Sequence, residues 1–454
     1  MSSNNNDNGL DGELRMNRLN SSSDKKVFPQ ILDLIVNFPI DNESYHNILS
    51  FFRKNSLNSF PECEQVLSIL NDFISSTDLS RCCHGIRCIY YVLCQKTFQF
   101  QTDFAYNLCN SLSRFINCPD QTIFYNLLRI LFFISTISSE YEQTIKQIIP
   151  INVLNDILIT STNQKVILSA INLFKMYLKT ERSSCIVYTS LCEVSHALIE
   201  HNQSNINVIN EAVKLCLFFA QKNECWITIY EKYNLFDKIL TLLSIDSTRL
   251  KLNIIKLVTN WLKFGQTINN INFQLIVPLI NYNDPVLQEA TIACIEQCLV
   301  SNGNTLQYFL DLGLLERAML CIQKDSFKAR IACISIFDTI IILRPEIAAV
   351  YLEQKLIPIL LELISEIHSG FTLAKAFHIM QKMVNFVIIR IGQKDVYQEL
   401  LNQFEYSNYE DVFEEFLQRS QSYKDRFTNK SVITESFESV MYDLNRIEEN
   451  LERM

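Results

Sequence analysis

Glycine and proline are scarce in this chain of 454 residues, which contains 8 glycines and 9 prolines. Because glycine-rich loops bind phosphates and glycine allows left-handed turns, this scarcity disfavours nucleotide-binding α/β folds and favours long helices. The sequence contains no G-x-x-x-x-G-K or G-x-G-x-x-G loop. Its six histidines lie in different parts of the chain without a fixed serine or cysteine partner nearby. We therefore expect a protein that is not an enzyme.

The sequence also lacks a hydrophobic run long enough to cross a membrane. The most apolar stretch, residues 122–137, contains Asn126 and Arg129 and is shorter than the ~20 residues that a span needs. The first 26 residues are rich in asparagine and serine, unlike a signal peptide. We therefore expect no membrane contact and a cytoplasmic or nuclear location.

The fifteen cysteines follow no disulfide or metal-binding spacing, as expected of a reduced protein. The closest approach to a metal motif is the group Cys82, Cys83, His84 and Cys88. Adjacent residues on a helix point ~100° apart, so these side chains could not converge on one ion without another segment. We expect no metal and no cofactor.

Negative charge gathers at the C-terminal end. From Asp395 onward there are 14 acidic and 6 basic residues, a net charge of −8 out of −9 for the whole chain. The rest is close to neutral, which argues against nucleic-acid binding, because phosphates require a basic face. We divide the chain into a disordered N-terminal segment (1–26), a repeat region (27–394) and an acidic helical segment (395–454).

The acidic segment ends in a regular apolar seam with alternating steps of three and four residues. The seam consists of Phe437, Val440, Leu444, Ile447, Leu451 and Met454. This spacing is typical of a coiled-coil dimer or of a helix that caps a repeat array, and both interpretations remain open.

The repeat region is identified by a pattern that recurs about every 42 residues. A polar residue is followed seven positions later by the first apolar residue of a helix, here called the anchor. The anchors are Ile48, Gly85, Leu127, Ala170, Ala212, Ile254, Ala290, Ala332 and Ala374. The polar residues, which predict helix N-caps, are Asp41, Asp78, Asp120, Asn163, Asn205, Ser247, Asn283 and Asp325, and only Ile367 breaks the pattern.

Each anchored helix carries an apolar stripe at the anchor and four residues beyond it. A second apolar helix precedes most anchored helices, as at residues 314–322 and 356–364. A single pair of helices cannot bury both of its apolar faces, but stacked pairs can share one core. The pattern predicts an all-α solenoid.

These residues resemble the armadillo-repeat family over roughly residues 30–395. Two stretches resemble importin-alpha more narrowly: residues 326–360 with Pro345, Glu346 and Pro358, and the first repeat with Asp41, Asn42 and residues 52–54. The resemblance implies a right-handed α-solenoid of about nine repeats with a helical C-terminal cap. It also implies an adaptor that holds an extended peptide in a concave groove for nuclear transport.

The sequence departs from importin-alpha at the residues that grip cargo in that family. There, the anchored helix presents tryptophan two residues after the anchor and asparagine six residues after it; here only Asn260 matches. Glu296 and Asp338 are acidic positions at which a basic segment could dock. Importin-beta is the implied receptor, although the basic segment that would bind it is reduced to Arg15, Arg18, Lys25 and Lys26.

Instead of these tryptophans and asparagines, basic residues recur two positions after the anchor, and aromatic residues follow four positions further on. We call the residues two positions after the anchors the ladder, and each of them a rung. The predicted groove residues are Arg87, Tyr91, Arg129, Phe133, Asn172, Lys214, Phe218, Lys256, Asn260, Glu296 and Asp338. Such cations and rings suit an extended acidic or phosphorylated segment, either external or the chain's own Glu410, Asp411, Glu414 and Glu415. The alternatives are a solvated helix face and an armadillo scaffold in the cytosol without a role in nuclear import.

Overall fold

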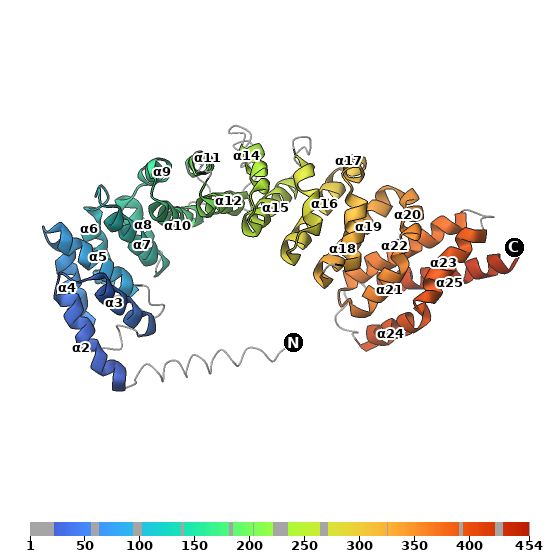
Figure 1. The fold of residues 1–454 in the computed structure, drawn as a ribbon, viewed down its shortest axis with the longest axis horizontal. Helices are drawn as coiled ribbons and strands as arrows, with labels where there is room; N and C mark the ends of the chain where they lie inside the picture. Colours follow the sequence, from blue (N-terminus) through green and yellow to red (C-terminus); the bar gives the residue numbers. More distant parts are fainter. Residues whose placement is uncertain are drawn as a thin grey trace. The chain divides into compact units, whose positions relative to one another are not determined.

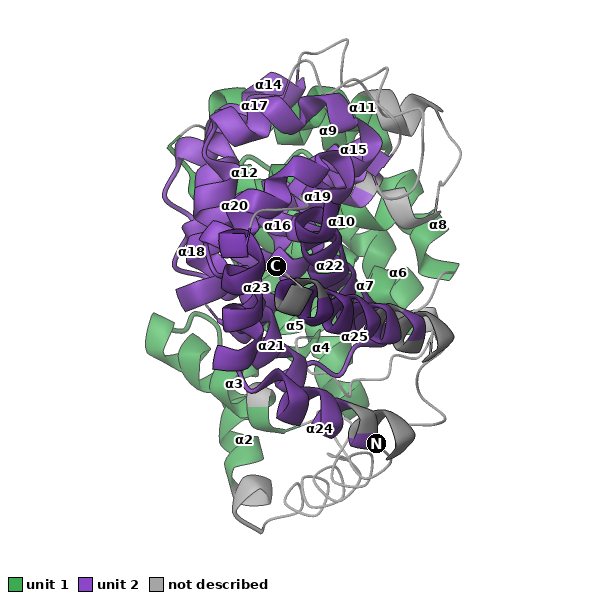
Figure 2. Ribbon diagram, turned by 90° about the vertical axis from the view of Figure 1, so that its right-hand side faces the viewer, with its two compact units in different colours: residues 1–215 green, residues 216–454 purple. Residues whose placement is uncertain are grey.

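The computed structural model describes residues 22–55, 63–93, 102–137, 140–180, 185–202, 204–220, 235–263, 271–324, 326–389, 394–422 and 430–453. Every regular element in these ranges is an α-helix or a short 3-10 helix, which confirms the all-α prediction (Figure 1). The chain forms two compact units, residues 1–215 and 216–454, which divide within α12 (Figure 2). The handedness of the solenoid and the number of repeats stay predictions.

The first unit is a stack of helical layers. Its helices are α2 (Ser22–Val36), α3 (Asn42–Lys54), α4 (Cys63–Ser75), α5 (Leu79–Leu93), α6 (Thr102–Ser113), α7 (Gln121–Ile137), α8 (Glu140–Ile148), α9 (Ile151–Thr160), α10 (Gln164–Thr180), α11 (Cys185–His201) and the first part of α12 (Ile206–Ala220). The anchored helices α3, α5, α7 and α10 pack side by side in that order. A second layer is made by α4 on α6 and α6 on α8.

The second unit repeats this arrangement. Its α-helices are α14 (Leu235–Thr241), α15 (Thr248–Lys263), α16 (Pro285–Ser301), α17 (Leu306–Asp311), α18 (Leu314–Lys324), α19 (Phe327–Leu343), α20 (Ala348–Glu353), α21 (Leu356–Glu366), α22 (Gly370–Ile389), α23 (Lys394–Tyr406), α24 (Tyr409–Ser422) and α25 (Lys430–Arg453). Short 3-10 helices lie at 242–244, 273–275, 277–281, 303–305 and 345–347. The anchored helices α15, α16, α19 and α22 pack in sequence, and α25 continues the layer.

The anchor of α5 is a glycine for a packing reason. A Cβ atom on Gly85 would lie 2.9 Å from the Cβ of Phe73 and 3.2 Å from the Cγ1 of Ile74. Real Cβ contacts are longer, so only glycine lets α5 approach α4 this closely.

Six of the predicted N-caps are confirmed. The side chains of Asp41, Asp78, Asp120, Asn163, Asn205 and Ser247 each accept a hydrogen bond from a backbone N–H in the first turn of the following helix.

In the last three repeats the predicted register is wrong. Asp284, and not Asn283, caps α16 by accepting from the N–H of Leu287. Ser326 caps α19, whereas Asp325 lies outside the described residues. Ser369 accepts from the N–H of Thr372 at the start of α22.

Burial follows the corrected caps. Seven residues after these caps come Thr291, Cys333 and Ala376, and all three are fully buried. The predicted anchors Ala290, Ala332 and Ala374 are only half-buried, because each lies one or two residues before the core position. The true anchors of α16, α19 and α22 are therefore Thr291, Cys333 and Ala376.

The last residues of the predicted disordered N-terminal segment form a helix. Residues 1–21 of the predicted disordered segment lie outside the described residues, but residues 22–26 belong to α2. Phe28, Ile31 and Ile35 of α2 are buried, so packing fixes this helix and its first turn continues from it.

The acidic C-terminal segment is built like the repeats before it. In three successive repeats, one residue with left-handed backbone joins two consecutive helices. These residues are Gly313 (φ 78°) between α17 and α18, Lys355 (φ 56°) between α20 and α21, and Asn408 (φ 47°) between α23 and α24. In addition, α24 packs on α21 and α25 packs on α22. The segment therefore continues the stack.

The apolar seam of α25 is buried inside the chain. Phe437, Val440, Leu444 and Ile447 are all buried, and the ring of Phe437 lies 5.8 Å from that of Phe377 on α22. This packing favours the cap interpretation over a dimer seam. The acidic residues considered as the chain's own ligand for the groove lie exposed on α24; they are Glu410, Asp411, Glu414 and Glu415. They belong to a helix that packs on α21 and not to an extended segment.

Candidate partner-binding face

The first arginine of the predicted ladder is held by tyrosines of its own chain. The Arg87 guanidinium lies 3.9 Å from the ring centroid of Tyr45 on α3, and its Nε donates to the Tyr91 hydroxyl at 3.0 Å. The Tyr45 hydroxyl also bonds the Nδ1 of buried His84 at 2.7 Å, while His84 Nε2 donates to the Ile35 carbonyl at 2.7 Å. With both ring nitrogens engaged, His84 has a structural role here.

The second arginine repeats the arrangement one helix further on. The Arg129 guanidinium on α7 lies 3.9 Å from the ring centroid of Tyr90 on α5, and it donates to the hydroxyl of Tyr125. Burial lowers the pKa of Arg129. Each arginine thus lies over a tyrosine of the preceding anchored helix, in a cation–π contact that stabilises the stack. Phe133 is half-buried on α7.

A carboxylate joins two lysines at the end of the first unit. Glu211 Oε1 pairs with Lys214 at 2.5 Å and Glu211 Oε2 pairs with Lys175 at 2.6 Å. Burial alone would raise the pKa of Glu211, but the hydrogen bonds from both lysines outweigh it and hold the pKa below its usual range. Asn172, on α10, is exposed. Of the four basic residues predicted for the groove, three therefore already contact other side chains of this protein: Arg87, Arg129 and Lys214.

The remaining predicted groove residues lie in the second unit. Lys256 is exposed on α15, Asn260 is half-buried one turn later, and Phe218 is half-buried on α12. In the uncorrected register, the residues two positions after the next two anchors are Ile292 and Ile334, but both are core residues. Two residues after the corrected anchors come Ala293, Ser335 and His378, which are exposed or half-buried like the corresponding residues of the earlier repeats.

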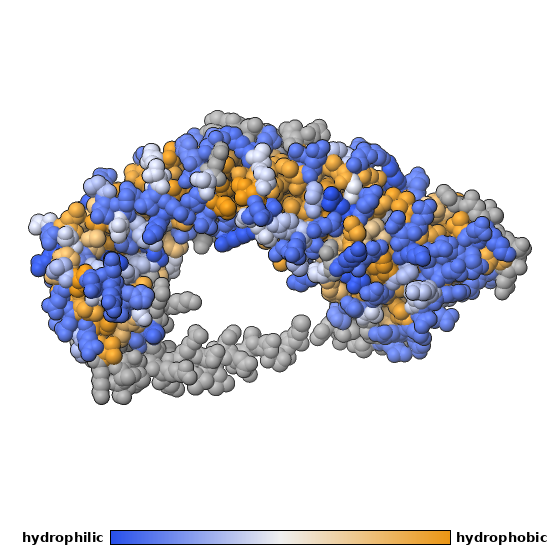
Figure 3. Space-filling model, viewed as in Figure 1, coloured by the Kyte–Doolittle hydropathy of each residue, from blue (hydrophilic) through white to orange (hydrophobic). Residues whose placement is uncertain are grey.

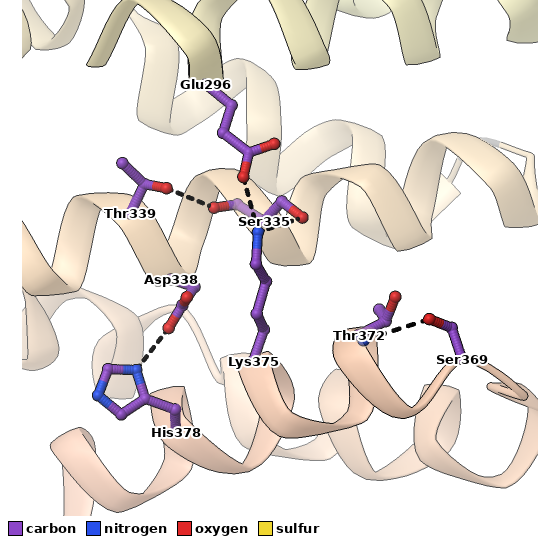
Figure 4. A network of polar contacts seen from close by, with 8 residues as sticks. All are labelled: Glu296, Ser335, Asp338, Thr339, Ser369, Thr372, Lys375 and His378. Atoms are coloured by element: carbon purple, nitrogen blue, oxygen red, sulfur yellow. Dashed lines mark hydrogen bonds and ion pairs between the residues drawn. The ribbon is translucent and has the colours of Figure 1, made fainter. Parts of the chain in front are cut away.

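The structure brings Glu296 and Asp338 together with polar partners that the sequence did not reveal (Figure 4). Lys375 Nζ on α22 donates to Glu296 Oε1 on α16 at 2.6 Å and to Ser335 Oγ on α19 at 3.0 Å. Since α19 lies between α16 and α22, the two charged side chains meet over it and Ser335 leaves room for them.

A second polar pair lies one turn further along the same helices. His378 Nδ1 lies 2.5 Å from Asp338 Oδ1, and the Asp338 side chain is only 10% exposed (Figure 4). The pairs join three successive anchored helices, and we call the exposed side of α16, α19 and α22 the anchored face. No sequence spacing predicted them, because the partners are 79 and 40 residues apart.

Apolar side chains are exposed beside this network. Val300 on α16 is 66% exposed, Ile342 on α19 is 56% exposed and Phe371 on α22 is 63% exposed. Val300 and Ile342 follow Glu296 and Asp338 by one turn, so they lie on the same side of their helices. Lys375 Nζ lies 4.7 Å from the centroid of the Phe371 ring. Figure 3 shows hydrophobic residues reaching the surface among hydrophilic ones.

The described part of the chain contains neither a cluster of metal ligands nor a helix suited to cross a membrane. No group of three or more histidine, cysteine or acidic side chains there could hold a metal ion. Burial raises the pKa of the Cys294 and Cys298 thiols to about 12. Among the described helices, none combines the length and apolar character that a membrane crossing requires.

Comparisons with known proteins show the fold. No protein-family model matches the sequence, and no curated protein matches it. The structure is similar to that of an engineered protein, with a TM-score of 0.63, 12% sequence identity, and coverage of 92% of this chain and 98% of that one. It is also similar to a structure from work on a phosphorylation switch in the interaction between cadherin and beta-catenin, with a TM-score of 0.59, 11% identity, and coverage of 92% and 80%.

These likenesses, together with the stacked helices, define an armadillo-like α-solenoid. Neither comparison points to importin-alpha.

Proposed function

We propose that this protein is a non-catalytic scaffold that holds an extended segment of a partner protein on the anchored face. The observation that carries the proposal is the pair of exposed apolar side chains, Val300 on α16 and Ile342 on α19, one turn beyond polar groups that are already hydrogen-bonded to Lys375 and His378. Exposed apolar side chains in such a setting mark protein-interaction sites. Fixed polar groups lose little freedom on binding, which favours affinity.

The spacing of the helices suits an extended ligand. Packed helices lie ~8–10 Å apart, and an extended chain rises ~3.3 Å per residue, so every third residue would meet the next helix. The proposed ligand presents apolar side chains at that interval to Val300 on α16 and Ile342 on α19. The similarity to the cadherin and beta-catenin structure supports the proposal at the level of fold analogy.

An importin-alpha-like nuclear adaptor is the finer form of this proposal. It requires a basic segment to bind Glu296 and Asp338. Both carboxylates already have partners within the chain, Lys375 and His378, so a basic ligand would have to displace them. The pairing therefore favours a scaffold that recognises apolar residues, in the cytoplasm or the nucleus, over a carrier of basic cargo.

The test places a photo-crosslinking amino acid at Val300 or Ile342 in the full chain, expressed in its source cell. Tyr442 on α25, which is 71% exposed, is the matched control position. We expect the same partner to be crosslinked from Val300 and Ile342 and not from Tyr442, and Ile342→Ala to weaken binding of the purified partner about tenfold. If Tyr442 gives the same crosslinks, the anchored face is not the site. Tight binding of a basic nuclear-localisation peptide, lost in Glu296→Gln, would instead support the adaptor.

A further inference from the structure

The helix that borders the anchored face has a basic exposed side. This helix, α15, packs against α16, and its exposed residues are Arg249, Lys256 and Lys263. They recur every second turn, so they form a column with ~10.5 Å between successive side chains. The sequence of α15 contains no aspartate or glutamate. The column therefore lines one edge of the anchored face with positive charge.

The two lysines of this column are not neutralised by their own chain. Neither Lys256 nor Lys263 pairs with a carboxylate of the described residues. The neighbouring helix α16 has an exposed acid, Glu289, but this residue precedes Glu296 by two turns and lies on the same side of α16. That side faces α19, because Glu296 reaches Lys375 over α19. The side of α16 that faces α15 therefore leaves the lysines unopposed.

Lys263 lies level with the two apolar residues of the anchored face. Each of Lys263, Val300 and Ile342 follows the anchor of its own helix by nine residues. Those anchors are Ile254, Thr291 and Cys333. Equivalent residues of stacked repeats lie side by side, one helix spacing or ~8–10 Å apart. An extended segment that contacts Ile342 and then Val300 therefore meets Lys263 about three residues further on.

A single ammonium group at this level suits a carboxylate. The next cation of the column, Lys256, is ~10.5 Å away along α15, too far to contact the same group. A phosphate carries more charge and more acceptor oxygens, and it is usually held by an arginine fork or by several donors together. Lys263 offers one point charge, which matches the single charge of aspartate or glutamate.

We infer that the partner segment on the anchored face carries an acidic residue three positions from one of two apolar residues, which are themselves three positions apart. The apolar residues contact Val300 and Ile342, and the carboxylate pairs with Lys263. Lys256 and Arg249 extend the positive field along α15 and speed association. This inference rests on the function proposed above, because it names the chemistry of the same partner.

The test selects ligands from a displayed library of short random peptides on the immobilised full-length protein. An excess of the double variant Val300→Ser with Ile342→Ser in solution removes peptides that bind elsewhere. Both side chains are exposed, so this variant keeps the fold, which circular dichroism checks. We expect the surviving peptides to share an aspartate or glutamate at the stated spacing from two apolar residues.

Charge reversal at Lys263 then measures the carboxylate contact. By fluorescence anisotropy, the surviving peptides should bind Lys263→Glu about tenfold more weakly than wild type, because an attraction becomes a repulsion. Lys324 is the matched control: it is also an exposed lysine at the last residue of its helix, α18, which lies in the other layer. Lys324→Glu should bind within about twofold of wild type. A peptide with lysine in place of its acidic residue should prefer Lys263→Glu over wild type.

The outcomes distinguish this inference from the function on which it rests. If no peptide survives the competition, the anchored face does not bind an extended segment and both proposals fail. If peptides survive but lack the acidic residue, or bind Lys263→Glu as tightly as wild type, only this inference is overturned. Phosphoserine in place of the acidic residue should change the affinity less than about tenfold; a larger gain would define a phosphopeptide site and overturn the assignment of a carboxylate.

Discussion

The ion pair between Lys375 and Glu296 should contribute measurably to the stability of the second unit. The perturbation is a double-mutant cycle of Lys375→Met and Glu296→Gln. Lys375→Met keeps the length of the side chain and removes the charge, whereas Glu296→Gln keeps an acceptor at Oε1. A matched cycle on Arg330 and Glu362, which pair at 2.9 Å between α19 and α21, is the control.

The burial of each pair sets the expected magnitude. The side chains of Lys375 and Glu296 are 13% and 25% exposed, whereas Glu362 in the control pair is 61% exposed. Exposed pairs contribute about 0.2–1 kcal/mol, and hydrogen bonds to charged groups about 1.5–3 kcal/mol. We therefore expect a coupling free energy of about 1.5 kcal/mol for Lys375 with Glu296 and about 0.5 kcal/mol for the control. Lys375→Met alone should cost about 2–3 kcal/mol, because it leaves a mostly desolvated carboxylate unpaired.

Urea unfolding measures both cycles. The chain has two tryptophans, and Trp261 on α15 is buried in the second unit. A Trp226→Phe background leaves Trp261 as the single tryptophan, so the fluorescence reports on the surroundings of α15. With a slope of about 2–3 kcal/mol/M, a coupling of about 1.5 kcal/mol corresponds to about 0.5–0.75 M in the unfolding midpoint. Repeating the cycles in 1 M NaCl should abolish the control coupling and retain most of the other, because buried pairs are screened less. Equal couplings for the two pairs, or a value below about 0.5 kcal/mol for Lys375 with Glu296, would refute the reasoning.

Three other predictions concern the repeats themselves. Cys333→Asp should lower the melting temperature far more than Ala332→Asp, since only position 333 is fully buried; the reverse order in calorimetry would restore the original register. Gly313→Ala should destabilise by about 1 kcal/mol and Lys355→Gly should stabilise by about 0.5–1 kcal/mol in urea titrations, because both positions have left-handed backbone; opposite signs would contradict that conformation. Burial lowers the pKa of His84, so the unfolded chain binds the proton more readily and stability should fall as the pH drops below about 6.5. His84→Gln should flatten this dependence between pH 7.5 and 5.5 in thermal unfolding, and an unchanged slope would assign it to other groups.

Local signals in the sequence were enough to predict the helices and most of their starts. An N-cap depends on one side chain and the next few backbone N–H groups, so Asp120 and Asn163 could be identified directly. The register failed where two neighbouring residues can both cap a helix, as with Asn283 and Asp284. Pro285 could have resolved that case, because proline favours the first position of a helix and so marks Asp284 as the cap.

The candidate site could be predicted only in part. Helix periodicity predicts a surface position two residues after the anchor, and Arg87 and Arg129 are half-buried there. Their tyrosine partners and the pairing of Lys375 with Glu296 depend on how separate helices stack. A single repeat contains no signal for these contacts, so only the three-dimensional packing reveals that Glu296 and Asp338 already have partners within the chain.

The rate at which each buried cysteine is alkylated reports how often the helices around it separate. Buried, high-pKa thiols such as Cys109 on α6 and Cys294 on α16 react with alkylating reagents only when the surrounding helices separate. Cys321 and Cys333 place further thiols on the neighbouring helices α18 and α19. Mass spectrometry of the alkylated protein can therefore rank the repeats by how often each one opens, without any engineered label. A partner on the anchored face should slow the reaction of Cys294 and Cys333 and leave that of Cys109 as the reference.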